Sequence, residues 1–186
     1  MNRPTLAALG VSAALLLSSC AGTSSDRSAA PAPPQAAGGT VVMDSTSMPP
    51  WAAPSDAPER AAQAGLDLGP MGMAEHYHPV LRVVIDGTDV PVPPNIGVDP
   101  TTGAMSAVHT HEDDGTIHIE ADSDDEVFTL GQFFTEWGVM LTPDQIGGVR
   151  AEPGQRVEVS SNGKPVTGDP ADLRLEPDQQ IVVSLG

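Results

Sequence analysis

The stretch FTLGQFFTEWG, at residues 128–138, carries the clearest local signals in the chain and decides the predicted fold class. Thr129 and Gln132 have the spacing of a capping box, in which each side chain hydrogen-bonds the backbone N–H of the other residue. Apolar side chains then recur three and four positions apart, which predicts a helix with one buried stripe ending at Gly138. The members of this stripe are Leu130, Phe133, Phe134 and Trp137.

The segments around this helix predict β-hairpins. Asp86-Gly87 and Asn162-Gly163 are dipeptides typical of two-residue hairpin turns, and alternating apolar residues flank both of them. The predicted hairpins cover residues 81–92, 107–121 and 157–166, and a last strand covers residues 181–185. One main helix packed against a small, mainly antiparallel sheet of hairpins predicts an α+β fold. The C-terminal run also resembles the end of a β-grasp domain.

The first twenty residues predict export and lipid attachment. Arg3 gives a positive start, and residues 6–17 form an apolar segment too short to span a bilayer, which together predict a signal peptide over residues 1–19. Leu17-Ser18-Ser19-Cys20 resembles the lipobox of bacterial lipoproteins. The resemblance implies that Cys20 is acylated and anchors the chain to the cell membrane, outside the cytoplasm. The alternative is a free cysteine after an ordinary signal peptide.

The remainder of the chain divides by composition. Residues 20–57 are rich in Ser, Ala, Pro and Gly and predict a disordered tether that begins at the lipidated cysteine. Trp51 is interpreted as an incidental aromatic within this tether. Residues 58–71 predict a short helix and a lead-in. Residues 72–186 predict a histidine-rich α+β domain.

Charge and cysteine content exclude several classes of function. The chain has 8 Lys and Arg against 25 Asp and Glu, a formal net charge of −17. This balance argues against nucleic-acid binding, because such binding needs basic side chains that neutralise phosphates. The single cysteine excludes an internal disulfide framework and any cysteine-rich zinc or iron–sulfur site.

All the histidines lie in one stretch of the chain. They are His76, His78, His109, His111 and His118. Residues two apart in a strand point to the same face, so each His-x-His pair presents two imidazoles on one side. In the hairpin at 107–121, a turn at Asp113-Asp114 pairs His109 with His118, whereas a turn at Asp114-Gly115 pairs His111 with His118.

Either register places three imidazoles on one face of the hairpin. The opposite face is mostly apolar, so the imidazole face is expected to point away from the core. Neutral imidazole is a common ligand for Zn, Cu, Fe and Ni, and the patch therefore predicts a transition-metal site at His109, His111 and His118. Glu120 shares the face, as a fourth ligand or as a partner that orients an imidazole. His76 and His78 are further candidates for this site.

The predicted metal is copper ahead of zinc. Met71, Met73 and Met105 lie near the histidines in sequence, and soft thioethers beside imidazoles suit copper. The alternative is that these methionines only fill gaps in the packing. Binding should weaken as the pH falls through about 6.5, where histidines become protonated.

A wider pattern joins the histidines and the helix. His109-Thr110-His111, the run Gly115 to Glu120, and FTLGQFF with Trp137-Gly138 together resemble a signature of uncharacterised secreted and lipid-anchored prokaryotic proteins. His76-x-His78 upstream is similar to that pattern too. The resemblance covers roughly a third of the chain and implies no particular activity.

These observations favour a lipid-anchored, extracytoplasmic module that captures, delivers or stores a transition metal. Its partners would be the membrane, through Cys20, and a protein that donates or accepts the metal. One alternative is a metalloenzyme with three histidine ligands and an open position, where Glu112 or Glu120 would act as the base. The other is a surface binding domain without metal, in which the histidines tune a response to pH.

Overall fold

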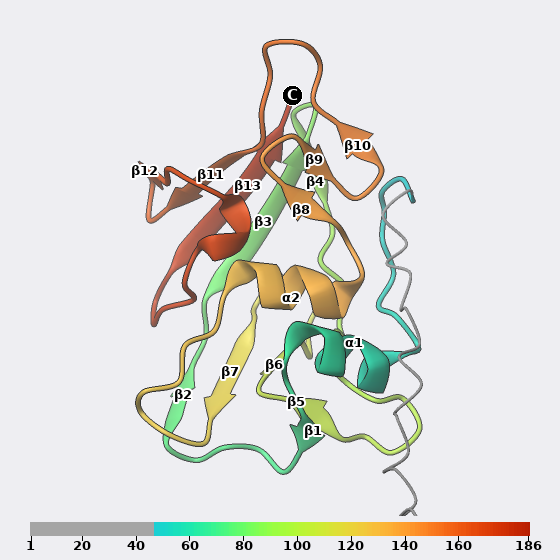
Figure 1. Cartoon of the computed structure of the whole chain (residues 1–186), viewed down its shortest axis with the longest axis vertical. Helices are drawn as coiled ribbons and strands as arrows, with labels where there is room; N and C mark the ends of the chain where they lie inside the picture. Colours follow the sequence, from blue (N-terminus) through green and yellow to red (C-terminus); the bar gives the residue numbers. More distant parts are fainter. Residues whose placement is uncertain (1–46) are drawn as a thin grey trace, which may run out of the picture. The chain divides into compact units, whose positions relative to one another are not determined.

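The main sheet consists of two hairpins joined by the last strand of the chain (Figure 1). The computed structural model describes residues 47–186. The strands are β3 (Val80–Ile85), β4 (Thr88–Val90), β11 (Glu158–Ser161), β12 (Lys164–Pro165) and β13 (Gln180–Leu185). Their order is β12-β11-β13-β3-β4, with β13 antiparallel to β11 and parallel to β3. The central pair is parallel, and a hairpin flanks it on each side.

Both predicted two-residue turns are confirmed. Asp86 and Gly87 have φ values of 50° and 73°, and Asn162 and Gly163 have the same two values. Two consecutive residues with positive φ match the twist of the strands on either side, which favours Asn, Asp and Gly at these positions. The residue types at the two turns therefore set the strand register of both hairpins.

The predicted helix is confirmed as α2 (Leu130–Trp137). Thr129 and Gln132 form the capping box, and Gly138 ends the helix in a left-handed conformation. The apolar stripe faces the core, since Phe133, Phe134 and Trp137 are all at most 2 % exposed. A second helix, α1 (Ala57–Ala64), packs against α2 and ends at Gly65. The two helices and the mostly antiparallel sheets confirm the α+β class.

The interpretation of Trp51 as an incidental aromatic is wrong. Its side chain is 6 % exposed and meets the Trp137 ring edge-on, with the ring centroids 5.7 Å apart. The Ser47 carbonyl accepts hydrogen bonds from the Trp51 indole and from the Gly148 backbone N–H. The folded part therefore includes residues from Ser47 onward, within what the composition predicted to be tether. Composition missed this because one large aromatic can anchor a segment that has no periodic pattern.

Smaller sheets complete the fold. They contain β1 (Leu68–Gly69) with β5 (Met105–Ser106); β8 (Leu141–Thr142), β9 (Gln145–Ile146) and β10 (Val149–Arg150); and β2 (Glu75–Tyr77), β7 (His118–Ala121) and β6 (Val108–His109). A short 3-10 helix covers Pro170–Asp172. In the described part of the chain, no helix is both long and apolar enough to cross a bilayer. The predicted signal peptide and Cys20 lie outside the described residues.

Candidate metal centre

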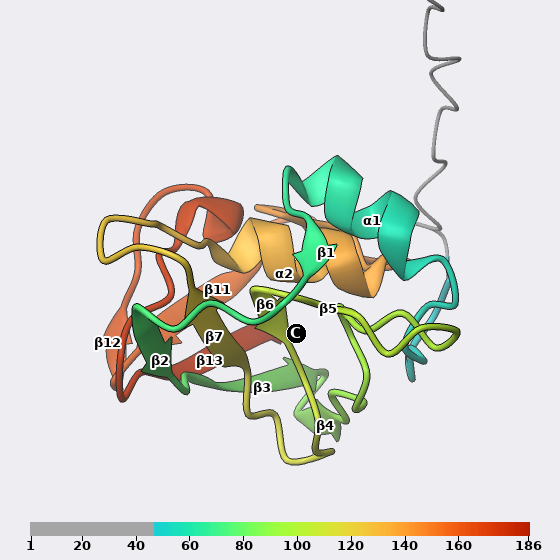
Figure 2. The same ribbon diagram turned by 90° about the horizontal axis from the view of Figure 1, so that it is seen from below.

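Four of the five histidines lie in or directly beside one three-stranded sheet, whose order is β2-β7-β6 (Figure 2). The strand pairing sets His109 opposite His118 and His76 opposite Glu120. The first of the two predicted registers is therefore confirmed. Because residues two apart share a face, His78 follows His76 on the side that also carries His118 and Glu120.

The connection between β6 and β7 is longer than the predicted two-residue hairpin turn. Strand β6 ends at His109 and β7 begins at His118, so residues 110–117 leave the ladder. The Thr110 N–H bonds the Ile96 carbonyl, and the Gly115 carbonyl accepts from the Leu81 N–H. These long-range bonds hold the segment open. His111 consequently lies outside the strand, yet its ring centroid is 4.7 Å from that of His109 and 4.8 Å from that of His118.

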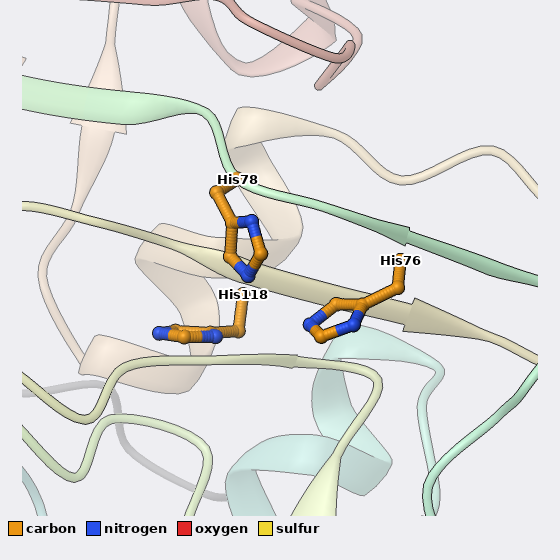
Figure 3. Close-up of side chains that lie close together, drawn as sticks. All are labelled: His76, His78 and His118. Atoms are coloured by element: carbon orange, nitrogen blue, oxygen red, sulfur yellow. The ribbon is translucent and has the colours of Figure 1, made fainter.

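The five imidazoles form two triads that share His118. Within each triad, the candidate ligand atoms all lie within 4.8 Å of one another. The inner triad is His109, His111 and His118, and the outer triad is His76, His78 and His118. Figure 3 shows the rings of His76 and His78 turned toward the ring of His118. The structure thus brings together every histidine that the sequence singled out.

The expectation that the imidazole face points away from the core is wrong for His109, which is 0 % exposed. The segment at Ile96-Gly97 covers it. Gly97 has φ +68°, and a Cβ there would lie 2.4 Å from the Val108 carbonyl oxygen and 3.2 Å from the His109 Cβ. Only glycine permits this close approach, because both the backbone angle and the space exclude a side chain. His111, His76 and His78 remain exposed.

The buried imidazole is held in one tautomer. His109 Nδ1 lies 2.8 Å from the Ser106 carbonyl oxygen, which can only accept, so Nδ1 carries the proton. Its Nε2 is left with a lone pair and lies 3.1 Å from His111 Nε2. A backbone carbonyl that fixes one ring nitrogen and leaves the other free is a usual arrangement for histidine ligands of metals.

Burial keeps this imidazole neutral. The pKa of His109 is lowered to about 4, mainly by desolvation and in smaller part by the neighbouring His111, while the Ser106 hydrogen bond opposes the shift. Desolvation and the charge of His118 also lower the pKa of His78. A neutral imidazole is the form that binds metals, so His109 is ready to act as a ligand at neutral pH.

Two carboxylates border the triads. Glu112 Oε2 lies 3.1 Å from His118 Nε2, and Glu120 Oε1 lies 3.4 Å from His76 Nε2. The role of Glu120 as a ligand or as an orienting partner stays a prediction. Glu112 contacts the shared histidine, which the sequence pattern did not indicate. Both negative charges favour a cation in the cluster.

The three methionines that the sequence singled out are exposed or half-buried. The Met73 side chain is 93 % exposed. Met71 is half-buried, and Met105 is a half-buried residue of β5 that pairs with Gly69. Each triad already brings three imidazoles together without a thioether. Thioether ligation therefore stays a prediction, and imidazole is the donor chemistry that the geometry supports.

The sequence pattern did not identify Ser106 and Glu136, which lie close to the inner triad. The Ser106 backbone carries no side-chain signal, and its carbonyl is what orients His109. Glu136 of α2 is 1 % exposed and its carboxyl neighbours the Ser106 side chain. Desolvation raises the pKa of Glu136 to about 8, and Ser106 only partly opposes this effect. A glutamate one position before Trp137, at the edge of an apolar stripe, was the available signal.

Comparisons with protein-family models, with curated proteins and with solved structures give no match. The geometry of the histidine cluster therefore carries the functional argument alone.

Proposed function

We propose that this protein binds a transition metal through its histidine cluster and holds it for capture, delivery or storage. The single observation that carries the proposal is the convergence of all five imidazoles into two triads. Five titratable rings packed this closely would repel one another if protonated. A cation that accepts their lone pairs gives a physical reason for the arrangement.

Several features of the inner triad support this function. His109 is neutral, fixed in one tautomer and shielded from solvent, whereas His111 is exposed. An ion can therefore reach His111 from solvent and then meet a ligand whose orientation is already set. Little rearrangement is needed on binding, which favours affinity.

Copper is the ion that we place ahead of zinc. Divalent copper binds nitrogen donors more tightly than the other first-row ions do, and the triads consist of imidazole nitrogen only. The methionine-rich lead-in at residues 71–73 would suit reduced copper on its way to the cluster. We also propose that the chain works outside the cytoplasm, anchored by an acylated Cys20.

Loss of His111 is expected to weaken metal binding by more than about tenfold, because one ligand of the inner triad disappears and loss of a residue that only supports a ligand already costs about that much. The measurement is a competition titration of Cu²⁺ and Zn²⁺ into the chain from residue 21 onward, made without a histidine tag. His111 is exposed, so His111→Ala should fold normally.

Asp124→Asn gives the matched control, because Asp124 is an exposed acid outside the cluster. It should bind metal like the parent protein. Copper affinity above zinc affinity is the expected order. Equal losses in both variants would mean that the acidic surface, and not the imidazoles, attracts the ions.

A further inference from the structure

We propose that the cluster holds two metal ions, one in each triad, and that the His118 imidazole bridges them. This inference rests on the proposed function and deepens it, because it assigns a number of ions and a shared ligand. The evidence is the way in which the rings group around His118.

The rings fall into two sets that meet only at His118. In the outer triad, the centroids of His76 and His78 are 4.6 Å apart, and they lie 6.4 and 4.7 Å from that of His118. In the inner triad, the centroids of His109 and His111 lie 5.3 and 4.8 Å from that of His118. Among residues 47–186, no ring contact joins the outer pair to the inner pair. In this arrangement a single ion cannot bind all five imidazoles, whereas two ions, one in each triad, can use all five between them.

An imidazole can serve two ions because it has two ring nitrogens. A neutral ring offers one lone pair and holds one N–H proton. In the metal-free protein this proton is on His118 Nε2, which lies 3.1 Å from the accepting Glu112 carboxylate. When the second ion binds His118, the proton leaves to solvent, the hydrogen bond to Glu112 is lost, and the resulting imidazolate donates one electron pair to each metal. With metal–nitrogen bonds of about 2 Å on each side, the two ions would lie about 6 Å apart.

The local charges make two cations tolerable at this separation. The imidazolate contributes one negative charge. Glu112 beside His118 and Glu120 beside His76 contribute one each. Three negative charges against two divalent ions leave a net charge of +1 in the cluster, within a chain whose formal charge is −17.

The two positions should differ in affinity. The inner triad contains the buried His109, which Ser106 holds in place. The outer triad has His76 and His78 exposed, so its rings lose more conformational freedom on binding. The inner position should therefore fill first.

Copper stoichiometry tests the proposal. The untagged chain from residue 21 onward is loaded with excess Cu²⁺, freed of unbound metal and analysed for copper and for its EPR signal. We expect two copper ions per chain, with most of the EPR intensity lost, because an imidazolate bridge couples the two spins antiferromagnetically. His78→Ala and His111→Ala should each leave one copper and restore one full mononuclear signal. Asp124→Asn should behave like the parent.

Each alternative outcome has a separate meaning. One copper per chain in the parent would overturn the two-ion proposal and leave the metal-binding function standing. Two coppers with full EPR intensity would overturn the bridge through His118. No copper retained by any of these proteins would overturn both the inference and the proposed function.

Discussion

Replacing His118 with alanine is expected to abolish tight metal binding altogether. His118 is the one residue common to both triads, so its loss leaves at most two imidazoles at either position. Loss of a residue that only supports a ligand costs about tenfold to a hundredfold in affinity, and loss of the shared ligand should cost at least about a hundredfold. The measurement is the competition titration with Cu²⁺ and Zn²⁺.

Two comparisons separate ligand loss from damage to the fold. The His118 side chain is only 16 % exposed, so the circular dichroism spectrum of His118→Ala is compared with that of the parent to show that the fold is kept. Glu112→Gln keeps the imidazole and removes only the carboxylate 3.1 Å from its Nε2, and should lower affinity less than His118→Ala does. If the metal affinity of His118→Ala were within threefold of that of the parent, the assignment of His118 as the shared ligand would be wrong.

Replacing Glu136 with glutamine is expected to change how stability depends on pH. The pKa of Glu136 is about 8 in the folded protein, above its ordinary value of 4.5, because burial opposes ionisation. The folded state therefore holds this proton more tightly than the unfolded state does. The contribution to stability is fully present below pH 4.5 and is lost as the pH rises toward 8.

The size of this effect follows from the linkage between protonation and unfolding. The free energy of unfolding of the parent should fall, relative to that of Glu136→Gln, by about 1.4 kcal/mol per pH unit between pH 5 and 8. Urea unfolding of both metal-free proteins at several pH values measures this slope. Glu152→Gln is the matched control, because Glu152 is exposed and its replacement removes the same charge. Parallel curves for the parent and Glu136→Gln would show that the carboxyl is already ionised in the folded state.

The sequence predicted correctly those helices and turns that depend on interactions between residues close together in the chain. The capping box at Thr129 and the turn residues at Asn162-Gly163 act within a few positions, and both appear as expected. The packing of Trp51 on Trp137 joins residues far apart in sequence, so no pattern of neighbouring residues could show it. The same holds for β13 beside β3, whose parallel pairing depends on the whole topology.

The sequence predicted which histidines are the candidate ligands, but it did not predict which segments pack around them. Strand parity placed His109, His111 and His118 on one face of the hairpin, because period-two geometry needs no knowledge of the rest of the chain. It left two registers open, and the structure has the one that sets His109 opposite His118. The addition of β2, which brings His76 and His78 to the cluster, is a long-range pairing. The burial of His109 depends on a separate segment at Gly97 that approaches from elsewhere in the chain. Parity gives the face of a residue, whereas cover by another segment decides its exposure.

X-ray absorption spectroscopy of the untagged protein loaded with one equivalent of Cu²⁺ or Zn²⁺ is the most direct test of the histidine cluster as a metal site. The account predicts a first shell with nitrogen at about 2 Å and the outer-shell scattering of at least three imidazole rings. A first shell of oxygen alone, without imidazole scattering, would contradict it.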